Sequence, residues 1–133
     1  YKETPRRRIM DDSKVLVVGH SANPNKTRSN SPTINRINKW LGECDVYTYS
    51  FVNLFSPGSP SGKNAQINET FLPEYLSNYN KIITLGNDVS QYFKKLGVSH
   101  FSAPHPSPRN RKFNNKSFEP DVIKRLQIYL NMI

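Results

Sequence analysis

Hydrophobic residues alternate along this chain between two kinds of segment. Short runs rich in β-branched and aromatic residues predict strands, and they cover residues 14–19, 45–53, 81–86 and 98–102. Between and after these runs, the sequence predicts helices over residues 32–42, 72–79, 88–96 and 120–132. Because strands and helices alternate, we expect an α/β fold in which helices cover a parallel sheet.

Capping and turn residues mark the ends of these elements. Ser31, followed by proline, is the expected N-cap of the first helix, and Gly42 is expected to end that helix. Asn87 or Asp88 is the expected cap of the third helix. The Pro- and Gly-containing stretch 55–68 predicts a loop. In the last helix, helical spacing predicts one apolar stripe formed by Val122, Ile123, Leu126, Tyr129 and Leu130.

Length and charge narrow the classes of function. A chain of 133 residues is the size of one domain, and we assign 1–13 to a basic N-terminal extension and 14–133 to the folded domain. The net charge of +9 favours a polyanionic partner, nucleic acid before membrane, with a solvated basic surface as the alternative. No apolar run approaches the roughly 20 residues of a membrane span, and the N-terminus has no signal-peptide core.

The single cysteine, Cys44, excludes an internal disulfide and any multi-cysteine metal site within this chain. A lone cysteine usually acts as a small buried apolar residue. The lack of disulfides is typical of proteins in a reducing compartment. We therefore expect an intracellular protein, cytoplasmic or nucleoid-associated, or nuclear in a eukaryote. We also expect a monomer.

Polar loops follow each predicted strand. In parallel α/β sheets, ligands bind beyond the carboxyl ends of the strands. The topology should therefore bring together residues 19–25, 51–54, 86–88 and 103–109.

The sequence His-Pro-Ser-Pro-Arg-Asn at 105–110 stands out among these loops. His105 follows a strand and lies between two prolines that restrict the backbone, so its ring is expected to point in a fixed direction. A structural loop histidine is the alternative. We expect Ser107 and Arg109 to contact phosphates of the nucleic acid. The basic residues after them are expected to add salt-sensitive affinity for nucleic acid. The alternative is that these charges belong only to a solvated loop. These basic residues are Arg111, Lys112 and Lys116.

Two asparagines also follow strands. Asn53 ends a largely apolar strand, so its amide either ties down a loop or faces a ligand, where it can pair with the edge of a base. Asn23, within Asn-Pro-Asn, predicts a turn. Its alternative role is to position a water molecule or a phosphate.

These residues resemble the motifs of the uracil-DNA glycosylase superfamily. Residues 105–110 look like its second motif, closest to the single-strand-selective monofunctional branch. The turn at 19–24 lies where the first motif lies, 50–53 resembles the strand that ends in the base-recognising asparagine, and 83–87 resembles the penultimate strand. The similarity spans about 14–130.

The resemblance implies a three-layer α/β/α sandwich with a four-stranded parallel sheet in the order 2-1-3-4. It implies excision of uracil or a 5-modified uracil from single- or double-stranded DNA by hydrolysis of the N-glycosidic bond, without metal or cofactor. The target base would be flipped into a pocket, as in DNA base-excision repair enzymes. A catalytically weak or inactive base-binding or regulatory module is the alternative. More distant is an enzyme that cleaves free nucleosides or nucleotides.

The resemblance also implies roles for single residues. His105 would donate a hydrogen bond to the oxygen that gains negative charge, and Asn53 would recognise the Watson–Crick edge. Asn23 would orient the attacking water. Ser107 would hold a phosphate, and Arg109 would fill the emptied base stack.

The first motif departs from the family pattern. Gly19 and Asn23 are separated by two residues more than usual, so His20 or Ser21 is an alternative occupant of the water-positioning place.

The family also supplies an aromatic ring between Asn23 and Ser31, where this chain has none. Phe51 or Phe55 is the expected substitute, unless the pocket is roomier.

Overall fold

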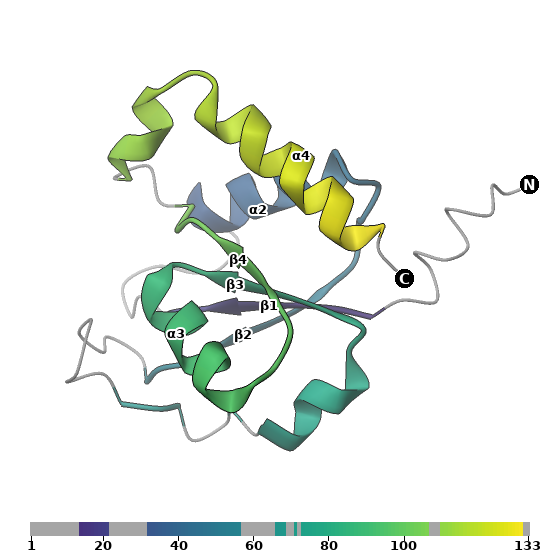
Figure 1. Cartoon of the computed structure of the whole chain (residues 1–133), viewed down its shortest axis with the longest axis vertical. Coiled ribbons are helices and arrows are strands. Elements are labelled where there is room, and N and C mark those ends of the chain that lie inside the picture. The colour runs from purple at the N-terminus through teal and green to yellow at the C-terminus, as the bar shows by residue number, and fades with distance from the viewer. Residues whose placement is uncertain are drawn as a thin grey trace, which may run out of the picture.

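A four-stranded sheet lies at the centre of the computed structural model, which describes residues 14–21, 32–56, 66–68, 71, 73–106 and 110–131 (Figure 1). The strands are β1 (Val15–Gly19), β2 (Ser50–Asn53), β3 (Lys81–Leu85) and β4 (Phe101–Ala103). Their order is β2-β1-β3-β4, and every neighbouring pair is parallel. The predicted α/β fold and its 2-1-3-4 order are therefore confirmed.

Helices cover both faces of this sheet, as Figure 1 shows. The side chains of Val15 and Val17 pack against α2 (Pro32–Gly42) and α4 (Phe118–Leu130). The alternate residues of β1 pack on the opposite face, against α3 (Asn87–Leu96). This alternation follows from the two-residue period of a strand, and it explains why β1 is apolar throughout. Among the described residues, no helix is long and apolar enough to cross a membrane.

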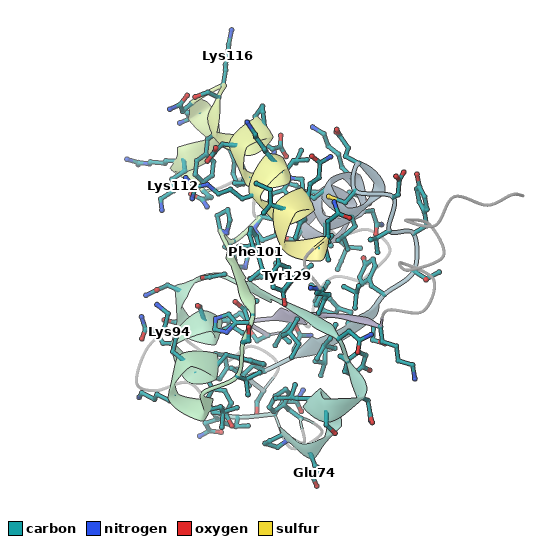
Figure 2. The ribbon with its side chains drawn as sticks, turned by 45° about the vertical axis from the view of Figure 1, so that its right-hand side comes forward. Glu74, Lys94, Phe101, Lys112, Lys116 and Tyr129 are labelled. Carbon is teal, nitrogen blue, oxygen red and sulfur yellow. The ribbon has the colours of Figure 1, made fainter. Side chains whose placement is uncertain are left out.

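The apolar stripe predicted for α4 is confirmed. Three residues of the stripe are buried, and Ile123 and Tyr129 pack against the same core. Tyr129 lies on Phe101 of β4, with ring centroids 5.6 Å apart (Figure 2). Its hydroxyl oxygen also accepts a hydrogen bond of 2.9 Å from the backbone N–H of Ile82, which ties α4 to the sheet.

Two predicted strands are shorter than their sequence patterns. β2 begins at Ser50, not at 45, because Ser50 pairs with Leu16 and β1 begins only one residue earlier. The preceding residues therefore have no strand to pair with. β4 begins at Phe101, not at 98, because its pairing with β3 starts at Ile83 and the preceding residues form the turn out of α3.

The cap predicted for α3 was wrong. The N-cap is Gly86, with φ 91°, and no side chain caps the helix. Since β3 leads into α3 through one residue at positive φ, glycine is favoured there. Asn87 and Asp88 instead lie in the first turn of the helix. The residue predicted to cap α2, Ser31, lies outside the described residues.

The remaining bounds differ only slightly from the prediction. Gly42 is the last residue of α2, and α4 begins two residues earlier than predicted. The helix predicted at 72–79 is a 3-10 helix, η3 (Pro73–Asn78), and a second one, η4 (Arg111–Asn114), precedes α4. In the predicted loop, Phe55 and Ile67 form an isolated antiparallel bridge.

Candidate functional site at the carboxyl edge of the sheet

The ends of the four strands are aligned at one edge of the sheet. Gly19 of β1 is in register with Asn53 of β2, and Leu85 of β3 is in register with Ala103 of β4. The helix that follows β1, α2, and the helix that follows β3, α3, pack on opposite faces of the sheet, and ligands of parallel α/β folds bind at such a switch point. The polar residues that follow the strands therefore surround the ends of β1 and β3. We call this place the carboxyl edge.

Asn53 and Phe51 lie over Gly19. A Cβ atom on Gly19 would lie 2.8 Å from Oδ1 of Asn53 and 2.8 Å from Cζ of Phe51. Asn53 and Phe51 can therefore lie this close only because Gly19 has no side chain. The backbone carbonyl of Asn53 also accepts a hydrogen bond of 3.3 Å from Nδ2 of Asn68, which fixes the end of β2.

His20 lies beside this group, at the end of β1. Its ring packs on Phe55 at a centroid distance of 4.6 Å. Its Nδ1 is 3.0 Å from Oγ of Ser21, and its Nε2 is 3.6 Å from Oδ2 of Asp88. Phe55 therefore packs on the histidine, whereas Phe51 covers Gly19. The two residues expected to replace the family's aromatic ring thus have different surroundings.

The role of Asp88 in the site was not predicted, although residues 86–88 were expected at this edge. Its position at the start of a helix indicated a cap, and the side chain instead faces His20. The available signal was its place directly after β3, since that places it at the carboxyl edge with the other polar groups.

His105 lies over Gly86 at the same edge. A Cβ atom on Gly86 would lie 3.5 Å from Cδ2 of the imidazole and 3.6 Å from its Cβ. Burial lowers the pKa of His105 from 6.5, and the electrostatic interaction with His20 lowers this pKa further. His105 is consequently neutral at pH 7, with one ring nitrogen able to donate and the other able to accept.

The loop that carries His105 is held by two neighbouring elements. The carbonyl of His105 accepts a hydrogen bond of 3.0 Å from Nδ2 of Asn110. The carbonyl of Pro106, whose side chain is fully buried, accepts a hydrogen bond of 3.5 Å from Nη1 of Arg36. The proline-restricted backbone of this loop is thereby anchored at the histidine and at the proline that follows it.

Arg36 itself is fixed by Glu119, a link that the sequence pattern did not reveal. The Nε atom of Arg36 is 3.2 Å from the carboxylate, and its guanidinium lies 4.0 Å from the centroid of the Phe113 ring. Nε1 of Trp40 donates to the same carboxylate at 2.8 Å, and Nζ of Lys39 donates at 3.3 Å. Burial acts to raise the pKa of Glu119, but the hydrogen bonds from Trp40 and Lys39 and the charges of Lys39 and Arg36 lower it.

The predicted cationic residues begin next to the His105 loop. Asn110 caps η4 by accepting a hydrogen bond of 3.1 Å from the backbone N–H of Lys112. Arg111, Lys112 and Lys116 are all exposed. Figure 2 shows Lys112 and Lys116 extending outward from this end of the molecule.

Three predicted site residues lie outside the described residues: Asn23, Ser107 and Arg109. The described residues contain no group of three or more His, Cys, Asp or Glu arranged to hold a metal ion. Cys44 is buried, and burial, with the charges of Glu43 and Asp45, raises its pKa to about 11.

The fold and the edge define a parallel α/β protein with histidines, an asparagine and an acid at the carboxyl ends of its strands. Comparisons with protein-family models, curated protein sequences and solved structures find no match for this chain.

Proposed function

We propose that this protein is a DNA glycosylase that removes uracil or a 5-modified uracil by hydrolysing the N-glycosidic bond. The observation that carries the proposal is the placement of Asn53 and His105 on either side of the end of β1. Asn53 ends β2, and His105 lies over Gly86 at the end of β3. Since neighbouring strands are about 4.8 Å apart, β2 and β3, which flank β1, are separated by about 10 Å.

Asn53 has the chemistry to recognise the base. Its amide can donate to O4 and accept from N3–H of uracil, whereas cytosine presents the reverse pattern of donors and acceptors. Discrimination requires that the amide does not turn over. Its Oδ1 lies against Gly19, where an added Cβ atom would be only 2.8 Å away.

His105 has the chemistry to stabilise the leaving group. When the N-glycosidic bond breaks, the base departs with the bonding electrons, and negative charge develops on its O2. The lowered pKa of His105, caused first by burial and then by His20, keeps the ring neutral, so one N–H can donate to this oxygen. A donor already in place as charge develops is an effective form of catalysis, because nothing must reorganise during the reaction.

The charge of the chain suits a DNA substrate. Flipping a base costs a few kcal/mol, which contacts to the phosphate backbone must supply. The exposed cations at and after η4 lie six to eleven residues after His105 in the chain, close enough to grip the strand near the flipped base.

The test is excision from labelled oligonucleotides, single- and double-stranded, that carry one uracil or 5-hydroxymethyluracil. Alkali then cleaves the abasic site. We expect strand cleavage by the wild type, with a loss of about 100-fold or more in His105→Ala. Asn53→Asp should lose excision too, and Asn78→Asp, an exposed asparagine at the end of η3, should match the wild type.

Two results would overturn the proposal. No cleavage of any of these substrates, combined with tight, salt-dependent binding, would indicate a base-binding module instead of an enzyme. Cleavage that survives in His105→Ala would place the chemistry elsewhere.

A further inference from the structure

The two ring nitrogens of His20 face different partners. Nε2 is 3.6 Å from a carboxylate oxygen of Asp88, and Nδ1 is 3.0 Å from Oγ of Ser21. A carboxylate only accepts hydrogen bonds, so the proton of the neutral ring belongs on Nε2, facing Asp88. Nδ1 then accepts from the Ser21 hydroxyl. Donation runs from Ser21 to His20 and from His20 toward Asp88.

The surroundings of His20 differ from those of His100, which is an ordinary structural histidine in the same protein. Nδ1 of His100 lies 2.8 Å from the carbonyl of Val98 and Nε2 lies 3.0 Å from Oγ of Ser90, so both nitrogens are satisfied. Ser90 is only 1% exposed, so no substrate reaches it. The pair joins α3 to the segment before β4.

In contrast, His20 is incompletely satisfied and lies at the carboxyl edge. Its Nε2 is buried and makes no hydrogen bond, because 3.6 Å is too long for one. Ser21 is half-buried, not enclosed. Hydrogen bonds between catalytic groups are often long before substrate binds and shorten when it does. With its proton on Nε2, the ring can accept a second proton on Nδ1, and the nearby carboxylate of Asp88 would then stabilise the positive charge.

We infer that Ser21, His20 and Asp88 form a relay that takes up the proton of the attacking water. The inference rests on the proposed glycosylase function and adds the group that accepts this proton. It differs from the role expected for Asn23, which is to orient the water.

The water oxygen attacks the anomeric carbon of the sugar while the C–N bond breaks, and its electron pair leaves with the base. A water proton passes to Oγ of Ser21 as the hydroxyl proton of Ser21 passes to Nδ1 of His20. The imidazolium that forms is stabilised by Asp88. Ser21 touches the water and is therefore a catalytic residue, whereas Asp88 acts through His20 and is a positioning residue.

The experiment compares Ser21→Ala, Asp88→Asn and the double variant, because all three keep the imidazole and its packing on Phe55. Single-turnover excision of uracil is measured with enzyme in excess, and DNA affinity is measured by fluorescence anisotropy. Each single variant should lose about 100-fold in excision rate, as expected for general base catalysis, with unchanged DNA affinity. The double variant should lose no more than the worse single variant, because groups that act as a unit are not additive. Ser21→Thr, which keeps the hydroxyl, should restore the rate.

Matched controls are Ser50→Ala and Asp121→Asn, which change an exposed serine at the start of β2 and an exposed carboxylate on α4. Both should excise at the wild-type rate. If the wild type excises uracil and either Ser21→Ala or Asp88→Asn stays within about twofold, the relay is wrong and the glycosylase proposal stands. Losses that multiply in the double variant also contradict the relay. If the wild type excises nothing, both proposals fall together.

Discussion

Replacing Gly19 by alanine tests the geometry of the carboxyl edge directly. The added Cβ would lie 2.8 Å from Oδ1 of Asn53 and 2.8 Å from Cζ of Phe51. Carbon atoms in contact prefer about 3.5–4.0 Å, so the contact with the Phe51 ring is about 0.7 Å or more too short. Neither neighbour is the free end of a long flexible chain, because Phe51 packs on the core and Asn53 ends a paired strand.

The cost can be estimated from other overpacked sites. Inserting a methyl group into a well-packed place costs about 1–3 kcal/mol. In a chain of this size, a loss of about 2 kcal/mol lowers Tm by roughly 8 °C. The displaced amide should also lose its alignment with the base, so excision of uracil should fall together with stability. Thermal and urea unfolding followed by circular dichroism measure the first effect, and the oligonucleotide assay measures the second.

Gly42→Ala is the matched control. There the nearest atom to an added Cβ is Cε1 of Tyr47 at 3.7 Å, an ordinary contact. Because Gly42 lies within α2, alanine should leave stability unchanged or raise it by about 0.5–1 kcal/mol. If Gly19→Ala unfolds at the wild-type temperature and excises uracil at the wild-type rate, the packing of Asn53 over Gly19 is refuted.

Three further predictions concern titration, the Arg36 anchor and the cysteine. The pKa of His105 is lowered in the folded state, so the neutral form of His105 stabilises the fold above pH 6.5. This contribution is lost as the pH falls through the lowered pKa. The midpoints of urea unfolding at pH 7.5 and pH 5 should therefore differ less in His105→Gln than in the wild type. Glu119→Gln should cost about 1–3 kcal/mol in urea unfolding, because it removes a charged acceptor from three donors, whereas an unchanged midpoint would show that these contacts contribute nothing. The Cys44 thiol, buried and with its pKa raised to about 11, should react with a thiol reagent at neutral pH far more slowly in native than in denatured protein; equal rates would contradict its burial.

Most of the fold could be predicted from the sequence because its periodicities are local. The continuous apolar run of β1 has the composition of a strand buried on both faces, and β1 is indeed buried throughout. The stripe on α4 likewise follows from helical spacing. The lengths of β2 and β4 could not be predicted, because a strand extends only as far as its neighbour's register allows.

The candidate site was predicted in part for the same reason. Asn53 and His105 each follow a strand, so topology alone placed them at one edge. Asp88 was expected at the same edge but was given no role in the site, because its local sequence favours a helix cap. The approach of β3 to β1 makes it a partner of His20. The anchor formed by Arg36 and Glu119 was not predictable either, since it joins residues of α2 and α4 that are far apart in the chain.

The sequence by itself determined the alternation of strands and helices, the parallel sheet and the loops that carry polar groups, because these depend on the spacing of apolar residues along the chain. The tertiary structure decided which side chains meet: the amide of Asn53 over Gly19, His105 over Gly86, and His20 between Ser21 and Asp88. The physical reason is that strand register and helix packing set these distances, and both arise from contacts between segments that are remote in sequence.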